Sequence, residues 1–140
     1  MRYQDVGWVA NGDINMGRGV KLISGTKYRV AQAGANELCV GVSPMIQRAA
    51  EITGTLAATT LAASAGESID IQQPGSIAQV VVGAAVVEGA WVKADTNGKA
   101  VTIAASGATK QAVLGLVLIG AANADEVATI MVWPHIQTMD

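Results

Sequence analysis

The chain has 140 residues, a formal net charge of −2 and only 14% charged residues. This length fits one domain, the charge balance argues against a dedicated nucleic-acid binder, and the single cysteine excludes a disulfide framework within the chain and a multi-cysteine metal site. The hydrophobic fraction of 51% includes 25 alanines, and 16 glycines add to the small residues, so the sequence favours close backbone packing over a bulky core.

Residues 1–18 are predicted to form an extended N-terminal arm outside the core. They are rich in glycine and polar residues, as in Asn11-Gly12-Asp13. The start of the chain is not a continuous apolar stretch, so we expect no targeting segment. The single domain is therefore assigned to residues 19–140.

Short β-branched stretches separated by glycine and asparagine fill most of that domain. This pattern predicts an all-β sandwich or barrel. Asn97-Gly98 lies between two of the stretches and is the clearest hairpin signal in the chain. The predicted strands are Val20 to Ile23, Tyr28 to Ala31, Leu38 to Val42, Ser68 to Gln72, Ile77 to Val82, Trp91 to Ala94, Val101 to Ala104, Val113 to Ile119 and Val127 to Val132.

An insertion at about 44–64 interrupts this rhythm. Pro44 and the run after it predict a short helix near 45–53, and an Ala/Thr-rich loop follows. Further on, the longest apolar run covers 112–122, or 11 residues, which is short of the ~18 needed to span a bilayer. We therefore expect no membrane insertion and no membrane partner.

A weak internal repeat relates two parts of the domain. Val20-Lys21 and Val40-Gly41-Val42 in the first part parallel Val92-Lys93 and Leu114-Gly115-Leu116 in the second. Two similar halves facing each other would form one small barrel or sandwich. The alternative is a chance similarity between two stretches rich in Gly, Ala and Val.

Catalytic and metal-binding groups are scarce. Cys39 is the only cysteine and His135 the only histidine, and they fall in different predicted elements. Cys39 lies in a strand-like run, where a buried and inert thiol is the favoured state. Trp8, Trp91 and Trp133 lack the interleaved basic residues of a stacking platform, so they are interpreted as core or interface anchors. The sequence thus predicts no enzyme, no cofactor and no metal site.

The order of small-residue motifs resembles the capsid decoration, or cement, proteins of tailed double-stranded-DNA bacteriophages. The segments that carry this resemblance are 89–101, 113–118 and 120–127, and the first half matches the same pattern through 19–42 and 65–71. The intervening segment 44–64 and the length of the N-terminal arm depart from the family pattern, which leaves the role of both segments open.

The resemblance implies a structural virion protein that is made in the host cytoplasm and binds the outer surface of the capsid. It would stabilise the shell of the major capsid protein, with a homotrimer as the assembled form. Arg2, Tyr3, Trp8 and Arg18 are the predicted capsid-binding residues, the aromatic ones as anchors and the arginines as partners of an acidic shell. The basic excess of residues 1–48 favours this assignment, and chance spacing of solvated charges is the alternative.

Two other classes of function stay open at this point. A head-surface protein that binds the host or a glycan would share the fold and use exposed aromatic side chains. A small trimeric β enzyme would need polar residues that converge between subunits, and the scarcity of histidine, cysteine and clustered carboxylates disfavours it.

Overall fold

The computed structural model describes residues 7–45, 61–104 and 109–139. These residues contain strands and no helix, so the predicted all-β fold is confirmed. No helix in these ranges is long and apolar enough to cross a membrane. From residue 46 on, the helix predicted near 45–53 lies outside the described residues. The strands are β1 (Trp8–Ala10), β2 (Ile14–Asn15), β3 (Gly19–Leu22), β4 (Arg29–Gln32), β5 (Gly41–Val42), β6 (Leu61–Ala63), β7 (Ser68–Ile69), β8 (Ile77–Val81), β9 (Trp91–Ala94), β10 (Ala100–Thr102), β11 (Thr109–Ile119) and β12 (Val127–Met139).

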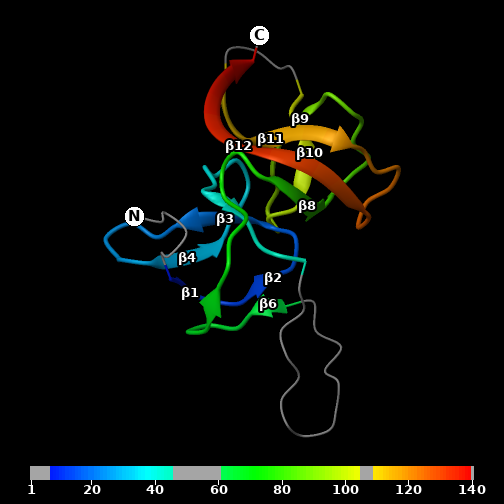
Figure 1. The fold of residues 1–140 in the computed structure, drawn as a ribbon. Coiled ribbons are helices and arrows are strands. Elements are labelled where there is room, and N and C mark those ends of the chain that lie inside the picture. Colours follow the sequence, from blue (N-terminus) through cyan, green and yellow to red (C-terminus); the bar gives the residue numbers. More distant parts are fainter. Residues whose placement is uncertain (1–6, 46–60, 105–108, 140) are drawn as a thin grey trace, which may run out of the picture.

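The strands form two five-stranded sheets and one two-stranded sheet. We call the sheet with order β5-β3-β4-β1-β7 the N-terminal sheet and the sheet with order β10-β9-β11-β12-β8 the C-terminal sheet, and β2 pairs with β6. The C-terminal sheet occupies the top of Figure 1, where the long strands β11 and β12 curl over, and the other two sheets lie below it. Strand pairing is antiparallel throughout the C-terminal sheet.

The strand pairing repeats between the two halves of the chain. In the first half β3 is flanked by β4 and β5, and Val20 pairs with Gly41. In the second half β9 is flanked by β10 and β11, and Val92 pairs with Gly115. All four pairings are antiparallel, so the residues of the sequence repeat occupy equivalent places in the two sheets.

The glycines of the repeat lie where two backbones approach closely. A Cβ atom on Gly41 would lie 2.4 Å from the carbonyl oxygen of Gln72, and one on Gly115 would lie 2.2 Å from that of Met131. In both halves the carbonyl belongs to a segment that pairs with the strand of the glycine. Gln72 lies beside β5 on the side away from β3, and Met131 lies in β12, on the side of β11 away from β9. The apolar-Gly-apolar step is therefore a packing requirement that both halves share.

The buried side chains of the described residues form two hydrophobic clusters. The smaller cluster lies in the first half and contains six buried residues: Ala10, Ile14, Val20, Val30, Ala63 and Ile69. The larger cluster lies mainly under the C-terminal sheet and includes Val92, Leu114 and Ile130. Ala33, Cys39 and Val42 of the first half also belong to it, so the larger cluster joins the two halves.

The predicted N-terminal arm is wrong for the part of it that the structure describes. Strand β1 lies between β4 and β7, and Ala10 and Ile14 are fully buried. Strands β1 and β2 are very short, and Asn11 and Gly12 lie between them. The alternation of apolar and polar residues is therefore too short to be recognised in the sequence. Residues 8–18 are part of the folded domain.

Other strand boundaries also differ from the predicted ones. The segment predicted as Leu38 to Val42 pairs as a strand only at Gly41–Val42. Strands β11 and β12 extend beyond their predicted ends, to Thr109 and Met139. Proline lacks the N–H group that a central strand uses for pairing. Pro134 lies beyond the part of β12 that pairs with β8, which ends at Met131, so the missing N–H breaks no described pairing there.

Candidate interaction surface

A row of apolar side chains crosses the outer face of the C-terminal sheet. Trp91 pairs with Leu116, Leu116 with Met131, and Met131 with Ile77. Residues paired across antiparallel strands project from the same face of a sheet, so these four side chains form one continuous row. We call Ile77, Met131, Leu116 and Trp91 the outer row.

The opposite face of the same strands is the one that packs into the core. Ala78, Val80, Ala128, Ile130 and Val132 are all buried there. On the outer face Ile77 is 64% exposed, and the other three members of the outer row are partly buried. The sheet is therefore apolar on both faces although the described chain covers only one of them.

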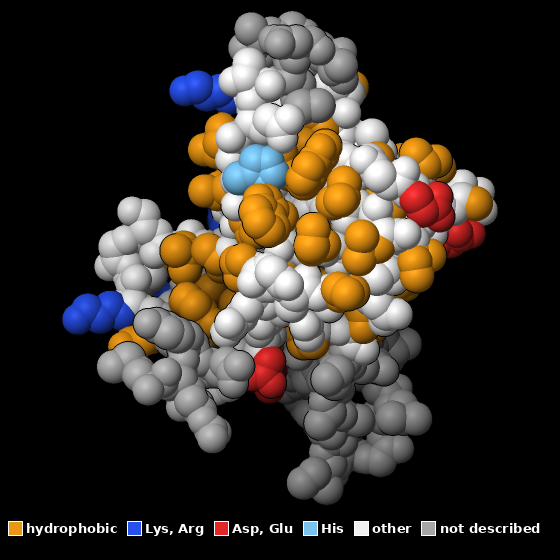
Figure 2. All heavy atoms as spheres, turned by 45° about the horizontal axis from the view of Figure 1, so that its top comes forward, with side chains coloured by type: hydrophobic (Ala, Val, Ile, Leu, Met, Phe, Trp, Pro, Cys, Tyr) orange, Lys and Arg blue, Asp and Glu red, His pale blue; other side chains and the backbone are white. Residues whose placement is uncertain are grey.

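The apolar surface continues on both sides of the outer row. Figure 2 shows hydrophobic side chains gathered around the single histidine, His135, and spread over the face that turns toward the viewer. Trp91 makes an edge-to-face contact with His135, with 5.3 Å between the ring centroids. Exposed Ile119 and Val127 lie on this face, whereas exposed Ile136 pairs with Ala112 on the side opposite His135.

Charged residues of opposite sign lie at the two ends of strand β11, and the basic one, Lys110, precedes Gln111, which contacts Lys93 on the Trp91 side of the sheet. Exposed Lys110 lies at the start of β11. Glu88 and Glu126 lie at the other end of that strand, because Glu88 accepts a hydrogen bond from the Gly120 amide and Glu126 accepts one from the Ala122 amide. The Gly120 bond lowers the pKa of Glu88, so this exposed carboxyl stays ionised.

A hollow of about 270 Å³ opens beside Trp133. Its lining is formed by Pro74, Gly75, Val132, Trp133 and Pro134. The Trp133 side chain is 52% exposed. An exposed tryptophan beside prolines offers a flat apolar surface with one polar N–H group.

The four residues predicted to bind the capsid fall in different environments. Arg2 and Tyr3 lie outside the described residues. Trp8 is in β1, where it is partly buried against the smaller core cluster and paired with Ile69. Part of its side chain therefore serves the fold, and its contact with a shell stays a prediction.

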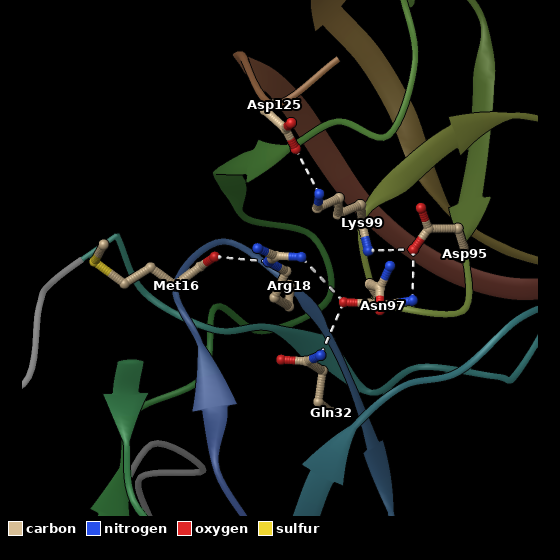
Figure 3. A network of polar contacts seen from close by, with 7 residues as sticks. All are labelled: Met16, Arg18, Gln32, Asp95, Asn97, Lys99 and Asp125. Atoms are coloured by element: carbon tan, nitrogen blue, oxygen red, sulfur yellow. Dashed lines mark hydrogen bonds and ion pairs between the residues drawn. The ribbon is translucent and has the colours of Figure 1, made fainter. Parts of the chain in front are cut away.

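Arg18 lies at the junction between the two halves, as Figure 3 shows. Its guanidinium donates hydrogen bonds to the Asn97 carbonyl at 3.1 Å and to the Met16 carbonyl at 3.3 Å. Gln32 donates a second bond to the same Asn97 carbonyl, at 2.8 Å, and Gly19 N–H donates to the Gly98 carbonyl at 2.9 Å. The predicted hairpin turn at Asn97-Gly98 is thus the element that the first half holds.

Two neighbouring contacts keep that turn in place (Figure 3). Asp95 accepts hydrogen bonds from the backbone N–H groups of Asn97 and Lys99, at 2.8 and 2.9 Å. Lys99 in turn donates to Asp125, and this bond lowers the pKa of the Asp125 carboxyl. Burial lowers the pKa of Arg18, against the opposing effect of Asp95 and Asp125, but an arginine stays charged at neutral pH.

The variant Arg18→Ala is expected to lower the free energy of unfolding by about 1–2 kcal/mol, because the Asn97 carbonyl loses one of its two donors at a partly buried junction. Urea unfolding measures this change. The matched control is Lys27→Ala, which removes an exposed charge and leaves the junction intact. Equal stability of the two variants would show that Arg18 does not hold the halves together.

Cys39 and His135 occupy separate sites. Cys39 is 3% exposed, and its thiol donates to the Glu37 carbonyl at 3.6 Å. One nitrogen of His135 lies 2.7 Å from the Trp133 carbonyl and the other 3.0 Å from the Gln137 side-chain oxygen. The structure describes no contact between the thiol and the imidazole. Within the described ranges it also shows no group of three or more residues of metal-binding type.

We expect Cys39 to resist thiol reagents in the folded protein. Burial, and to a smaller extent the Glu37 carboxylate, raises the pKa of the thiol to about 12, so almost no thiolate exists at pH 8. Ellman's reagent measures the rate of modification, which should rise sharply when guanidinium unfolds the chain. The exposed thiol of a Leu22→Cys variant provides the positive control. Rapid modification of native Cys39 would contradict this prediction.

The outer row was not predicted from the sequence, although one signal for it exists. Residues 112–119 and 127–133 are apolar at both odd and even positions. Such strands are typical of a sheet covered on both faces. The described core residues pack against only one face of β11 and β12. The lack of alternation between apolar and polar positions therefore indicated that another surface covers the second face.

Comparison with solved structures finds a related fold. The crystal structure of the head fiber gp8.5 N base in bacteriophage phi29 matches with a TM-score of 0.61, at 16% sequence identity and over 90% of each chain. No protein-family model and no curated protein matches the sequence. At this identity the likeness establishes a shared fold.

Proposed function

We propose that this chain is a structural protein of a bacteriophage head that binds the outer surface of the capsid and stabilises the shell of the major capsid protein. The observation that carries the proposal is the fold shared with the phi29 head fiber base over 90% of both chains. The resemblance of the sequence motifs to capsid decoration proteins supports the same assignment independently. We place three copies together on the shell, as that resemblance implies.

The described surface is suited to adding contact area. It exposes a broad apolar face, and only 14% of the residues are charged. Three copies in one body bind through three contacts at once, and avidity can exceed the affinity of one contact by about 10² to 10⁴ if the geometry lets all three engage. Weak individual contacts are therefore sufficient to retain the protein on a head.

The test is addition of the purified chain to phage heads assembled without it. We expect saturable co-sedimentation with these heads, and heads that carry the protein should rupture at a higher temperature than bare ones. Heads whose sites are already occupied serve as the control and should bind no more protein. Failure of the folded protein to bind bare heads would reject the proposal.

A second candidate function is attachment to a host surface or glycan, and the exposed Trp133 beside its hollow favours it. Aromatic side chains provide the flat apolar surface on which a sugar ring can lie. A host-cell pull-down with the wild type and Trp133→Ala tests this function, with Tyr28→Ala as the control because Tyr28 is similarly exposed in the first half. Loss of capture by Trp133→Ala alone would favour attachment.

A further inference from the structure

We infer that the end of the β3–β4 hairpin is the part of this chain that contacts the shell, and that it binds an acidic protein surface there. This inference rests on the proposed function, which places the chain on a phage head, and it names the contacting segment and the chemistry of its partner. We call Lys27, Tyr28 and Arg29 the hairpin tip. All three residues are exposed, and the loop between β3 and β4 lies at the left edge of the molecule in Figure 1, away from the C-terminal sheet.

Tyr28 has a backbone conformation that its residue type rarely adopts. Its φ of 60° lies in the left-handed region, which is strained for a bulky side chain. Asn36 and Asp125 are the other non-glycine residues with positive φ in the described ranges, and their short polar side chains tolerate this region. The Asn36 side chain also bonds to the backbone of Lys110 and Ala112. Within the described ranges the Tyr28 side chain forms no hydrogen bond, and it is 58% exposed, so neither bonding nor burial accounts for a tyrosine at this position.

Hydrogen bonds fix the backbone of the hairpin tip. The Tyr28 carbonyl accepts a bond from the Val9 N–H at 2.7 Å, and Val9 pairs with Arg29 in the parallel register of β1 and β4. The Ile23 N–H donates to the Arg29 carbonyl at 3.3 Å, and the Thr26 hydroxyl donates to the Ile23 carbonyl at 2.9 Å. Side chains presented from a fixed backbone lose less conformational freedom on binding, so the hairpin tip is preorganised for a partner.

The hairpin tip carries the cations that the first half leaves without an acidic partner. Arg18 donates to backbone carbonyls at the junction between the halves, and Lys21 forms an ion pair with Glu37. Within the described ranges, Lys27 and Arg29 form no ion pair. Because they flank the exposed tyrosine, the hairpin tip presents an aromatic ring between two positive charges.

This combination fits an acidic protein surface. Carboxylates of the partner would pair with Lys27 and Arg29, and Tyr28 would supply the aromatic anchor that is common at the centre of protein interfaces. Arg29 is available for this pairing because its contact with the Asn11 side-chain oxygen is long, at 3.4 Å. Asp70, at the same end of the sheet, follows β7 and is separated from β4 by β1. Two cations on a chain of net charge −2 are few for a nucleic-acid site, so a protein partner is favoured.

The first test compares two charge reversals of equal size in binding to heads assembled without the protein. Lys27→Glu should weaken binding about tenfold or more, because it places a negative charge against an acidic surface. Lys110→Glu is the matched control, since it reverses an exposed lysine at the start of β11 and should bind like wild type. Added salt should weaken wild-type binding more than binding of Lys27→Glu. Equal binding by the two variants would overturn the inference.

The second test separates binding from folding. Tyr28→Gly removes the aromatic ring and relieves the backbone strain, so urea unfolding should show no loss of stability while head binding falls about tenfold or more. Trp133→Ala is the control, because it removes a similarly exposed aromatic side chain from the second half and should leave head binding unchanged. Unchanged head binding by a folded Tyr28→Gly chain would contradict a contact through the hairpin tip.

The outcomes of the first test also distinguish this inference from the proposed function. A folded wild type that binds no heads rejects the proposed function and the inference with it. A wild type that binds heads no more tightly than Lys27→Glu overturns the inference alone. Retention of the wild type by duplex DNA at physiological salt, with loss of retention in Lys27→Glu, would overturn the assignment of a protein partner.

Discussion

Replacing Gly115 by alanine is expected to lower the free energy of unfolding by about 2–3 kcal/mol. The added methyl carbon would lie 2.2 Å from the Met131 carbonyl oxygen and 3.2 Å from the Ile130 side chain. The carbonyl belongs to the paired strand β12 and cannot rotate away like the end of a flexible side chain, so β11 and β12 must move apart. Urea unfolding followed by tryptophan fluorescence measures the loss.

The control for this substitution is Gly12→Ala, because a Cβ atom on Gly12 would meet nothing within 4 Å. Gly41→Ala provides a second comparison, since its methyl group would lie 2.4 Å from the Gln72 carbonyl oxygen in the other half. We expect Gly41→Ala and Gly115→Ala to be similarly destabilised. A Gly115→Ala chain as stable as Gly12→Ala would contradict the close approach of the two strands.

Removing residues 1–18 is expected to abolish the native state of the N-terminal sheet. The truncation deletes β1, which pairs with both β4 and β7, and it removes the fully buried side chains of Ala10 and Ile14. Loss of one large buried aliphatic side chain alone costs about 2–5 kcal/mol, against a total stability of about 5–15 kcal/mol for a typical domain. Circular dichroism and urea unfolding of a chain that begins at Gly19 measure the effect.

A chain that begins at Gly7 is the matched control, because it retains every described contact. It should unfold cooperatively, like the full chain. The same shortened chain tests the predicted roles of Arg2 and Tyr3, since it should bind heads more weakly while staying folded. A chain beginning at Gly19 that unfolds with wild-type stability would show that β1 and β2 are dispensable.

Much of the C-terminal sheet could be predicted from local patterns. Asn97-Gly98 marks the turn between β9 and β10 because Gly98 adopts a φ of 74°, which glycine allows at little cost. The predicted strand Trp91–Ala94 matches β9 at both ends. The repeat also located Gly41 and Gly115 in equivalent positions, because close strand contact imposes the same residue on both halves.

The elements that escaped prediction depend on contacts between distant residues. Strand β2 consists of Ile14 and Asn15 alone and pairs with β6, at the end of the segment predicted as an insertion. Two residues carry no periodicity, so only the folded partner identifies them. The contact of the Arg18 guanidinium with the carbonyl of Asn97, 79 residues further along the chain, likewise left no local signal, and the contact of Arg18 with a shell stays a prediction.

The candidate surface was harder to predict than the fold. In β12, outward Val127 and Met131 are as apolar as inward Ala128 and Ile130, so hydrophobicity alone does not assign the faces. Register does assign them, because Met131 pairs with the 64% exposed Ile77 and Ile130 pairs with the buried Ala78. The position of the interaction surface therefore follows from strand pairing, which the sequence does not specify by itself.

The most direct test of the head-surface assignment is an electron cryomicroscopy map of phage heads to which the purified chain has been added. Heads assembled without the protein provide the reference map. The account predicts added density on the outer surface of the shell, in clusters of three copies. A folded chain that adds no ordered density to the outer surface would contradict the account, and separated single copies would contradict the trimer.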